Sequence, residues 1–374
     1  MRLKPFLLDD WLDQYEHNVE FDLAASTGPT WTVRDVLALA DEETRARFVD
    51  HKLVYSRVAG ADGLREAIAE MQRVPVEAVQ VVTGAAEALL AVMWTAAEPG
   101  ANVILPKPGF ATFSAIPESL GIETRFYEVR RENGFRIDVD EIKRLADAKT
   151  KMILVNSPHH PTGATIGDEE MESLHEFAAG RGIQLVCDEV YHPIYHGREV
   201  KSAARLPHAT VIGDLSKAFS LPGVRTGWIV EHDAERRKRY WTARAYFTVT
   251  NSTTGEILSE IAIRRRDVVL GRTQEVASGN LKLLEGFMAG HREVLGWIPP
   301  RGGMTAFPWL VSGEDARPFC RAAAERGILL APGDCFDAPA HFRLGFAAAG
   351  EDFSRALERF GIFVKSWAEN MVTT

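Results

Sequence analysis

The stretch TVIGDLSKAFSLPGVRTGWIV, residues 210–230, joins two short apolar runs through a loop of mostly small and apolar residues. Two cations lie in this loop: Lys217 and, eight positions later, Arg225. A solvated surface lysine needs no such setting, whereas a lysine that must reach into a pocket does. We interpret the two runs as strands and the loop as the carrier of a functional lysine.

Further apolar runs precede this stretch along the chain. They are VQVV (79–82), NVIL (102–105), TRFYEV (124–129), MILV (152–155) and IQLVC (183–187). Most are continuous rather than alternating, which is typical of strands buried on both faces. Helical patterns separate most of them, as in residues 168–182. This order predicts an α/β fold with a mostly parallel sheet and helices on both faces.

The pattern changes past residue 232, where long helices run to about residue 290 and a smaller α+β segment closes the chain. The short elements at the start are expected to pack with this C-terminal part. We therefore predict a large domain over residues 46–285. Residues 1–45 and 286–374 would form a small α+β domain.

Composition excludes several classes of partner. The 374 residues carry a net charge of −9, which argues against nucleic acid or an anionic membrane. The longest apolar runs fall short of the ~18 residues that span a bilayer. Three cysteines without metal-ligand spacing predict a reduced, cytoplasmic protein with no metal site.

Polar residues gather where the predicted strands end. Asp188 follows one strand and Lys217 follows another. Ligands of open parallel sheets bind beyond these carboxyl ends. A partly desolvated Lys217 would have a lowered pKa, and its neutral amine can form a Schiff base with an aldehyde. A buried Asp188 needs a cation, and a pyridinium nitrogen would serve.

Residues near the same strand ends could also bind a phosphate group and an aromatic ring. Arg225 can hold a phosphate through its planar fork. The turn TGAAE opens a helix after a strand, which leaves the amides of Ala85 and Ala86 free for the same phosphate. Phe110 can stack on a ring. Taken together, these are the requirements of pyridoxal 5'-phosphate (PLP). Taken singly, each residue also has a purely structural interpretation: surface lysine, cap, core or salt bridge.

Eight motifs then carry a family resemblance over nearly the whole chain. They are VYSRVAGADGLREAIA (54–69), VVTGAAEALL (81–90), PKPGFATF (106–113), VNSPHHPTG (155–163), VCDEVYHPIY (186–195), LSKAFSLPGVRTGW (215–228), PRGGMTAFP (300–308) and FRLGF (342–346). The chain resembles the fold-type I PLP enzymes of the class I/II aminotransferase family. The resemblance implies that Lys217 forms the Schiff base, Asp188 pairs with the pyridine nitrogen and Tyr191 donates to the ring hydroxyl.

The remaining roles also come from the resemblance. Phe110 would stack on the ring, and Arg225 with Ala85 and Ala86 would bind the phosphate. Tyr55 would reach the phosphate of a neighbouring subunit, which implies a homodimer. Arg343 would grip the substrate's α-carboxylate, and Gly28 lies in a segment, residues 24–31, that resembles the lining of the substrate site. His192 is a further candidate for the side-chain pocket.

Two positions depart from the family pattern. His160 stands where the family usually has an asparagine that donates to the ring oxygen. An imidazole N–H can make the same bond, but it can also titrate. Asp214 stands three residues before the lysine, where the family usually has a small or hydroxyl residue near the phosphate. A carboxylate there repels phosphate unless it turns away or stays protonated.

Three functions follow. The main prediction is a PLP-dependent aminotransferase that moves an amino group between an α-amino acid and a 2-oxo acid. The alternative is a PLP-dependent lyase or cyclase acting at the β and γ carbons, because residues 300–346 resemble the C-terminal part of capreomycidine synthases, family members that cyclise an arginine derivative. The third is an amino-acid-sensing regulator, which would carry a helix-turn-helix domain that is not seen before residue 45.

Overall fold

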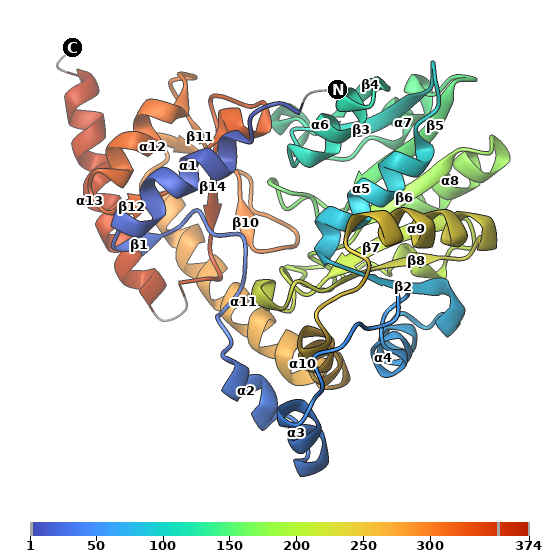
Figure 1. Ribbon diagram of the computed structural model, residues 1–374. Helices are drawn as coiled ribbons and strands as arrows, with labels where there is room; N and C mark the ends of the chain where they lie inside the picture. The colour runs from blue at the N-terminus through green and yellow to red at the C-terminus, as the bar shows by residue number, and fades with distance from the viewer. Residues whose placement is uncertain (1–2, 350–351, 373–374) are drawn as a thin grey trace.

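The computed structural model describes residues 3–349 and 352–372 and is built around one seven-stranded sheet. The strand order is β2-β8-β7-β6-β5-β3-β4 (Figure 1). The bounds are β2 Val79–Val82, β3 Asn102–Lys107, β4 Glu123–Glu128, β5 Thr150–Asn156, β6 Gln184–Asp188, β7 Ala209–Asp214 and β8 Gly227–Glu231. Only β8 runs antiparallel to its neighbours in this sheet. The predicted α/β fold class is confirmed.

The continuous apolar runs are explained by burial on both faces of the sheet. In β5, Ile153 and Val155 belong to one hydrophobic cluster, while Met152 and Leu154 belong to the other. Successive side chains of a strand point to opposite faces, so each face needs its own apolar residues. Apolar layers on both faces hold the strand ends in fixed register.

Helices cover both faces. The bounds are α4 Asp62–Gln72, α5 Gly84–Ala96, α6 Thr112–Ser119, α7 Val139–Leu145, α8 Asp168–Gly180, α9 Ala234–Phe247 and α10 Thr253–Arg264. Leu89 and Val92 place α5 in one cluster, whereas Met171 and Leu174 place α8 in the other. The spacing of three between Met171 and Leu174 is that of one helix face.

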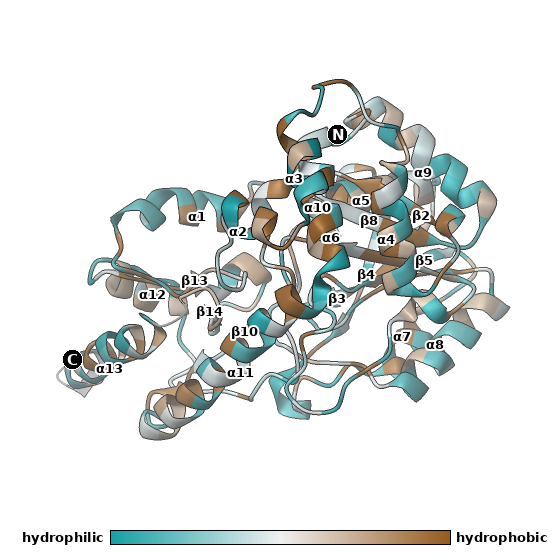
Figure 2. Cartoon of the chain, turned by 90° about the horizontal axis from the view of Figure 1, so that it is seen from below, coloured by the Kyte–Doolittle hydropathy of each residue, from teal (hydrophilic) through white to brown (hydrophobic). Residues whose placement is uncertain are grey.

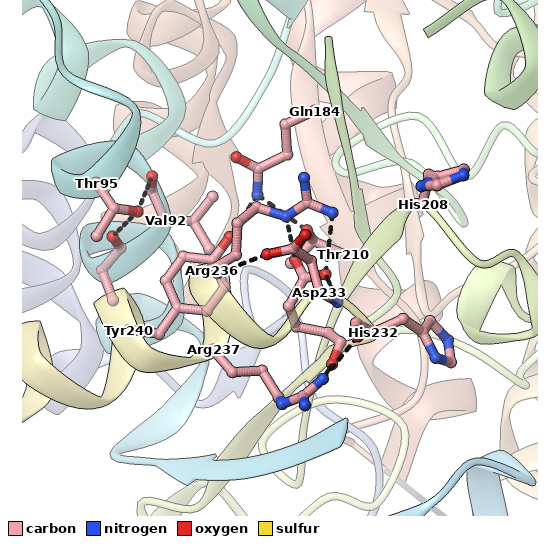
Figure 3. Close-up of polar contacts among 12 residues, drawn as sticks. Val92, Thr95, Gln184, His208, Thr210, His232, Asp233, Arg236, Arg237 and Tyr240 are labelled. Atoms are coloured by element: carbon pink, nitrogen blue, oxygen red, sulfur yellow. Dashed lines mark hydrogen bonds and ion pairs between the residues drawn. The ribbon is translucent and has the colours of Figure 1, made fainter. Parts of the chain in front are cut away.

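A buried polar cluster ties α9 to the end of the sheet opposite the carboxyl ends of β6 and β7 (Figure 3). The Thr210 hydroxyl donates to Glu231 Oε2 at 2.6 Å, and Gln184 Nε2 donates to Thr210 Oγ1 at 2.9 Å. Arg236 donates to both carboxylate oxygens of Glu231, at 2.9 and 3.1 Å. The buried Glu231 charge is therefore paired, as a charge away from water must be.

The N-terminal segment joins the C-terminal part. The elements are α1 Leu7–Tyr15, β1 Phe21–Asp22, β9 Leu295–Gly296, β10 Thr305–Ala306, β11 Trp309–Leu310, α12 Ala316–Ala324, β12 Ile328–Leu329, β13 Ala331–Pro332, β14 Phe342–Gly345 and α13 Phe353–Val372. Strand β1 pairs in parallel with β12, and β14 lies between β10 and β13. Residues some 300 positions apart thus pair in β1 and β12, whereas β10-β14-β13 is a separate three-stranded sheet, hereafter the small sheet.

Three helices connect the two parts. Helices α2 Val33–Ala38 and α3 Glu42–Val49 lie below the small sheet, and α2 packs on α10 (Figure 1). Helix α11, Arg266–Gly290, runs from α10 towards α13. Residues 33–38 therefore contact the large part of the molecule. The domain boundaries at residues 45 and 285 stay a prediction.

Helices α11 and α13 carry hydrophilic and hydrophobic residues interleaved along their length (Figure 2). Within the described ranges, 3–349 and 352–372, no helix is long and apolar enough to cross a membrane.

Candidate active site

A cavity of about 300 Å³ lies where the carboxyl ends of the parallel strands face the small sheet and α1. Its lining is Phe6, Leu8, Asp9, Leu12, Ser26, Ala85, Ala86, Leu89, Phe110, Phe113, Asn156, His160, Asp188, Val190, Tyr191, Asp214, Ser216, Lys217, Pro222, Arg225 and Arg343. Nine of the residues predicted from sequence therefore meet in one cavity. The exceptions are Tyr55, Gly28 and the further candidate His192.

The Lys217 amine is held in this cavity by the loop that follows β7. Its Nζ lies 2.8 Å from the Ser26 hydroxyl, which comes from the N-terminal segment. Burial lowers the pKa of Lys217 to about 8, although the nearby carboxylates of Asp214 and Asp188 oppose the shift. Near neutral pH a useful fraction of this amine is therefore unprotonated, as a nucleophile or base requires.

Asp188, the last residue of β6, is a buried carboxylate that needs a cation. Its Oδ1 accepts the Val190 N–H at 3.2 Å. Burial raises the pKa of Asp188 to about 7, and Asp214 adds to the rise. Across the described residues, no lysine or arginine forms an ion pair with Asp188. A cationic ligand nitrogen would restore its ionised form.

His160 lines the cavity beside Arg343. Its Nε2 lies 2.9 Å from Arg343 Nη1, and because a guanidinium only donates, Nε2 must accept. The proton is thereby assigned to Nδ1, which is buried and has no partner. Burial, reinforced by Arg343, lowers the pKa of His160 well below its usual value. Without a ligand a cation beside Arg343 is disfavoured, and the expected titration of this imidazole in the cofactor-bound protein stays a prediction.

Asn156 was given no role in the sequence analysis, although it is the second residue of the quoted motif VNSPHHPTG. Its Oδ1 accepts the backbone N–H of His160 at 2.7 Å, and its Nδ2 donates to the Asp188 carbonyl at 3.1 Å. The side chain therefore fixes two site residues relative to each other. Its position at the end of a predicted strand was the available signal.

The turn between β2 and α5 forms a cradle for an anion. Gly84 adopts φ +75°, and a Cβ at this position would lie 2.6 Å from Arg225 Nη2. Glycine thus allows the guanidinium to rest on the backbone that leads into Ala85 and Ala86. Arg225 Nη1 also donates to the Pro222 carbonyl at 3.0 Å, which orients its fork.

Asp214 is also buried at this cradle. It accepts a hydrogen bond from the Ser216 N–H at 3.0 Å, and the nearby Ala85 amide favours its ionised form. Burial raises the pKa of Asp214 above its usual value, and these two N–H groups limit the rise. The carboxylate therefore competes for an amide that the sequence analysis assigned to phosphate.

Two aromatic rings enclose the middle of the cavity. The Tyr191 hydroxyl donates to the Ser26 carbonyl at 3.4 Å, and burial raises its pKa to about 12. The Tyr191 ring lies nearly parallel to His160, with an interplanar angle of 9°. Phe110 meets His160 edge-on at 6.2 Å and Phe6 at 5.7 Å.

Arg343 reaches the cavity from β14. Its Nε donates to the Ala24 carbonyl at 3.1 Å, and the Phe336 ring lies 5.3 Å from its guanidinium carbon. Buried and braced in this way, it is a preorganised carboxylate ligand.

Three candidates lie elsewhere. Gly28 packs against Ser220, Thr273 and Met304, and a Cβ there would lie 2.2 Å from Ser220 Oγ. Tyr55 is 86% exposed. His192 lines a separate groove of about 800 Å³ and lies 2.9 Å from the Tyr195 hydroxyl.

The donor set fits PLP. A buried carboxylate without a cation, Asp188, matches a pyridinium. The Gly84–Arg225 cradle matches a phosphate. An amine of lowered pKa, Lys217, matches an aldehyde.

Comparisons with known proteins agree. The profile of the aminotransferase class I and II family matches residues 27–360. Capreomycidine synthase of Streptomyces vinaceus is 27% identical, with 94% of this chain and 91% of that protein covered. Aspartate/prephenate aminotransferase of Thermus thermophilus is 30% identical, with 85% of each chain covered. A PLP-dependent aminotransferase structure from Streptococcus suis superimposes with a TM-score of 0.92 at 27% identity, covering 98% of this chain and 99% of the other.

Proposed function

We infer that Lys217 holds the cofactor and moves the proton at the substrate's α-carbon. The premise is that this chain belongs to the aminotransferase class I and II family and is a PLP-dependent aminotransferase. The observation that carries this role is the lowered pKa of an amine that shares one cavity with Asp188 and Arg343. When bound, PLP supplies an aldehyde for the substrate's amino group and a ring that withdraws electrons from the α-carbon. The neutral Lys217 amine would accept the proton from the substrate's α-carbon and pass it to the former aldehyde carbon, and in the second half-reaction it would carry a proton in the reverse direction.

The other residues of the cavity would bind and orient the cofactor and the substrate. Asp188 would pair with the pyridine nitrogen, while Tyr191 and His160 would donate to the ring oxygen. Phe110 would lie against the ring. Arg343 would bind the α-carboxylate of the amino acid through its fork.

The phosphate is assigned to the turn before α5. The amides of Ala85 and Ala86 would donate to its oxygens, and Arg225 would balance its charge. Gly84 lets this guanidinium approach the backbone closely.

We also propose a cytoplasmic homodimer. The segment around Tyr55 exposes Leu53 at 84% and Val54 at 63%. Exposed apolar side chains next to one another are typical of an interface. A second copy would cover them and would receive Tyr55 at its phosphate. All three cysteines are free and buried, which supports a reducing compartment. The Gly28 contact with substrate stays a prediction.

A cyclase or lyase is the second candidate. Capreomycidine synthase is similar to this chain over almost its whole length. His160 and Asp214 also depart from the usual residues at the ring oxygen and the phosphate. Both positions act on how the cofactor distributes charge, which decides whether bonds at the β carbon break.

The test of function is a product balance. The PLP-loaded protein is incubated with a panel of L-amino acids, with and without a 2-oxo acid. Transamination predicts one keto acid formed for each 2-oxo acid consumed, and no ammonia. Ammonia or a cyclised product that forms without any 2-oxo acid would favour the second candidate. A protein that takes up no PLP would exclude both.

Replacing Asp214 should make cofactor binding tighter and less dependent on pH. Its raised pKa means that the carboxyl is protonated at low pH and ionises as the pH rises, so repulsion of the phosphate grows with pH. We expect the wild-type Kd for PLP to increase as the pH rises and Asp214 ionises. Asp214→Ser and Asp214→Asn should bind about tenfold more tightly where the wild-type Asp214 is ionised. Fluorescence titration measures the Kd, and an equally steep pH dependence in both variants would contradict the repulsion.

A further inference from the structure

Helix α1 lies over the cavity with two different faces. Leu8 and Trp11 are buried, and Trp11 Nε1 donates to the Leu330 carbonyl at 2.8 Å. Arg317 lies over the Trp11 ring at 5.1 Å. These contacts anchor α1 to the small sheet and α12. The residues Phe6, Asp9 and Leu12 line the cavity.

Asp9 is the charged group of the cavity that the proposed function does not use. The three cations there are assigned to cofactor or carboxylate, and Asp188 and Asp214 lie at the strand ends. Among the residues that the structure describes, Asp9 has no hydrogen-bond or ion-pair partner for its carboxylate. The rim around it is otherwise apolar, formed by Phe6, Leu8, Leu12, Leu89, Phe110 and Phe113.

The charges of neighbouring groups act on the Asp9 carboxyl in opposite directions. Partial burial raises its pKa, and Asp13, one helical turn further along α1, adds to the rise together with Asp10. Lys217 and Arg343 act in the opposite direction. The cations Lys217 and Arg343 therefore favour the ionised form of Asp9, while the other acidic residues of α1 disfavour it.

We propose that the substrate is an amino acid whose side chain ends in a cation, either an amino or a guanidino group, and that Asp9 binds this end. The assignment rests on the proposed function, because it places the α-carboxylate on Arg343. The apolar rim would cover the methylene groups of such a side chain, as long charged side chains commonly require. A second carboxylate on the substrate would instead meet the negative charge of α1.

Binding of unreactive analogues tests the proposal without turnover. The probes are 5-guanidinopentanoate and 6-aminohexanoate, which lack an α-amino group. Their neutral counterparts are 5-ureidopentanoate and heptanoate. Calorimetry on the PLP-loaded wild type should show one cationic probe binding about tenfold more tightly than its counterpart. The guanidino and amino pairs tell which cation the site prefers.

Two variants locate the effect. Asp9→Asn should abolish the preference for the cation while changing the Kd of the neutral probe less than about twofold. Asp10→Asn is the matched control, because Asp10 is the next residue of α1 and does not line the cavity. It should keep the preference. An equal loss of the preference for the cation in Asp9→Asn and Asp10→Asn would overturn the proposal. A wild type that shows no preference would also overturn it, including a wild type in which a partner subunit covers Asp9.

Kinetics separate this proposal from the proposed function. The ratio of kcat/KM for arginine over citrulline, or for lysine over norleucine, should be about tenfold in the wild type and close to one in Asp9→Asn. Equal turnover of charged and neutral amino acids by the wild type would refute the specificity and leave the aminotransferase intact. If no amino acid reacts, the proposed function fails, and the analogue binding still decides the role of Asp9.

Discussion

Lys217→Ala is expected to lower turnover by about 10⁴-fold or more, because the variant loses both the amine that holds the cofactor and the base that moves the α-proton. The rest of the cavity remains, including the Gly84–Arg225 cradle and Asp188. The variant should therefore still bind PLP, although without a covalent link. Single-turnover absorbance measurements give the rate, and equilibrium dialysis gives the affinity.

Borohydride provides an independent measurement for the same residue. In the wild type, reduction should leave the mass of the reduced cofactor on the peptide that contains Lys217. The matched control is Lys201→Ala, which removes an exposed lysine outside the cavity and should keep the wild-type rate. An added small amine should partly restore the Lys217→Ala rate, since the missing group is a free base. Cofactor mass on another lysine would show that the assignment is wrong.

The fold was predictable because its strands are buried on both faces. Runs such as Met152 to Val155 have no polar alternation, and each of their side chains enters one of two apolar clusters. The strand ends then place their polar residues on one rim. For this reason Asp188 and Lys217 could be brought together from sequence before any contact was known.

What sequence could not supply depends on contacts between distant parts of the chain. The tautomer of His160 is set by Arg343, which lies 183 residues away. Asp9 enters the cavity only because Trp11 attaches α1 to Leu330, a separation of 319 residues. A nine-residue helix, read alone, shows an acidic face that is typical of solvent exposure.

The competition at the phosphate cradle was visible in sequence only in outline. Asp214 was expected to repel phosphate, turn away or stay protonated. In the structure it lines the cavity, and the nearby Ala85 amide favours its ionised form. This effect depends on the distance between the end of β7 and the start of α5, which local patterns do not encode.

Asp188→Asn should have the second-largest effect on catalysis and an opposite effect on stability. An amide cannot stabilise a cationic pyridine nitrogen, so we expect α-proton removal to slow by about 10²–10³-fold. In the protein without PLP, burial holds the pKa of Asp188 at about 7, above the ~3.9 of an unfolded aspartate. The folded form therefore binds more protons, and its stability falls as the pH rises from about 4 to about 7.

Above this pH range the ionised Asp188 carboxylate destabilises the folded protein, whereas asparagine stays uncharged. Asp188→Asn without PLP should therefore be more stable than the wild type at about pH 8, by about 1–3 kcal/mol, and the advantage should shrink as the pH falls towards 5. Chemical denaturation across this pH range measures the difference in the free energy of unfolding. The exchange of the α-deuteron of a labelled substrate with water measures the rate of α-proton removal. The control is Asp233→Asn, at the exposed start of α9. The hydrogen bond from the Arg236 N–H lowers the pKa of the Asp233 carboxyl. Removing this carboxylate should therefore destabilise the protein at neutral pH. Wild-type exchange rates in Asp188→Asn would sink the assignment of Asp188 to the pyridine nitrogen, whatever the stability shows.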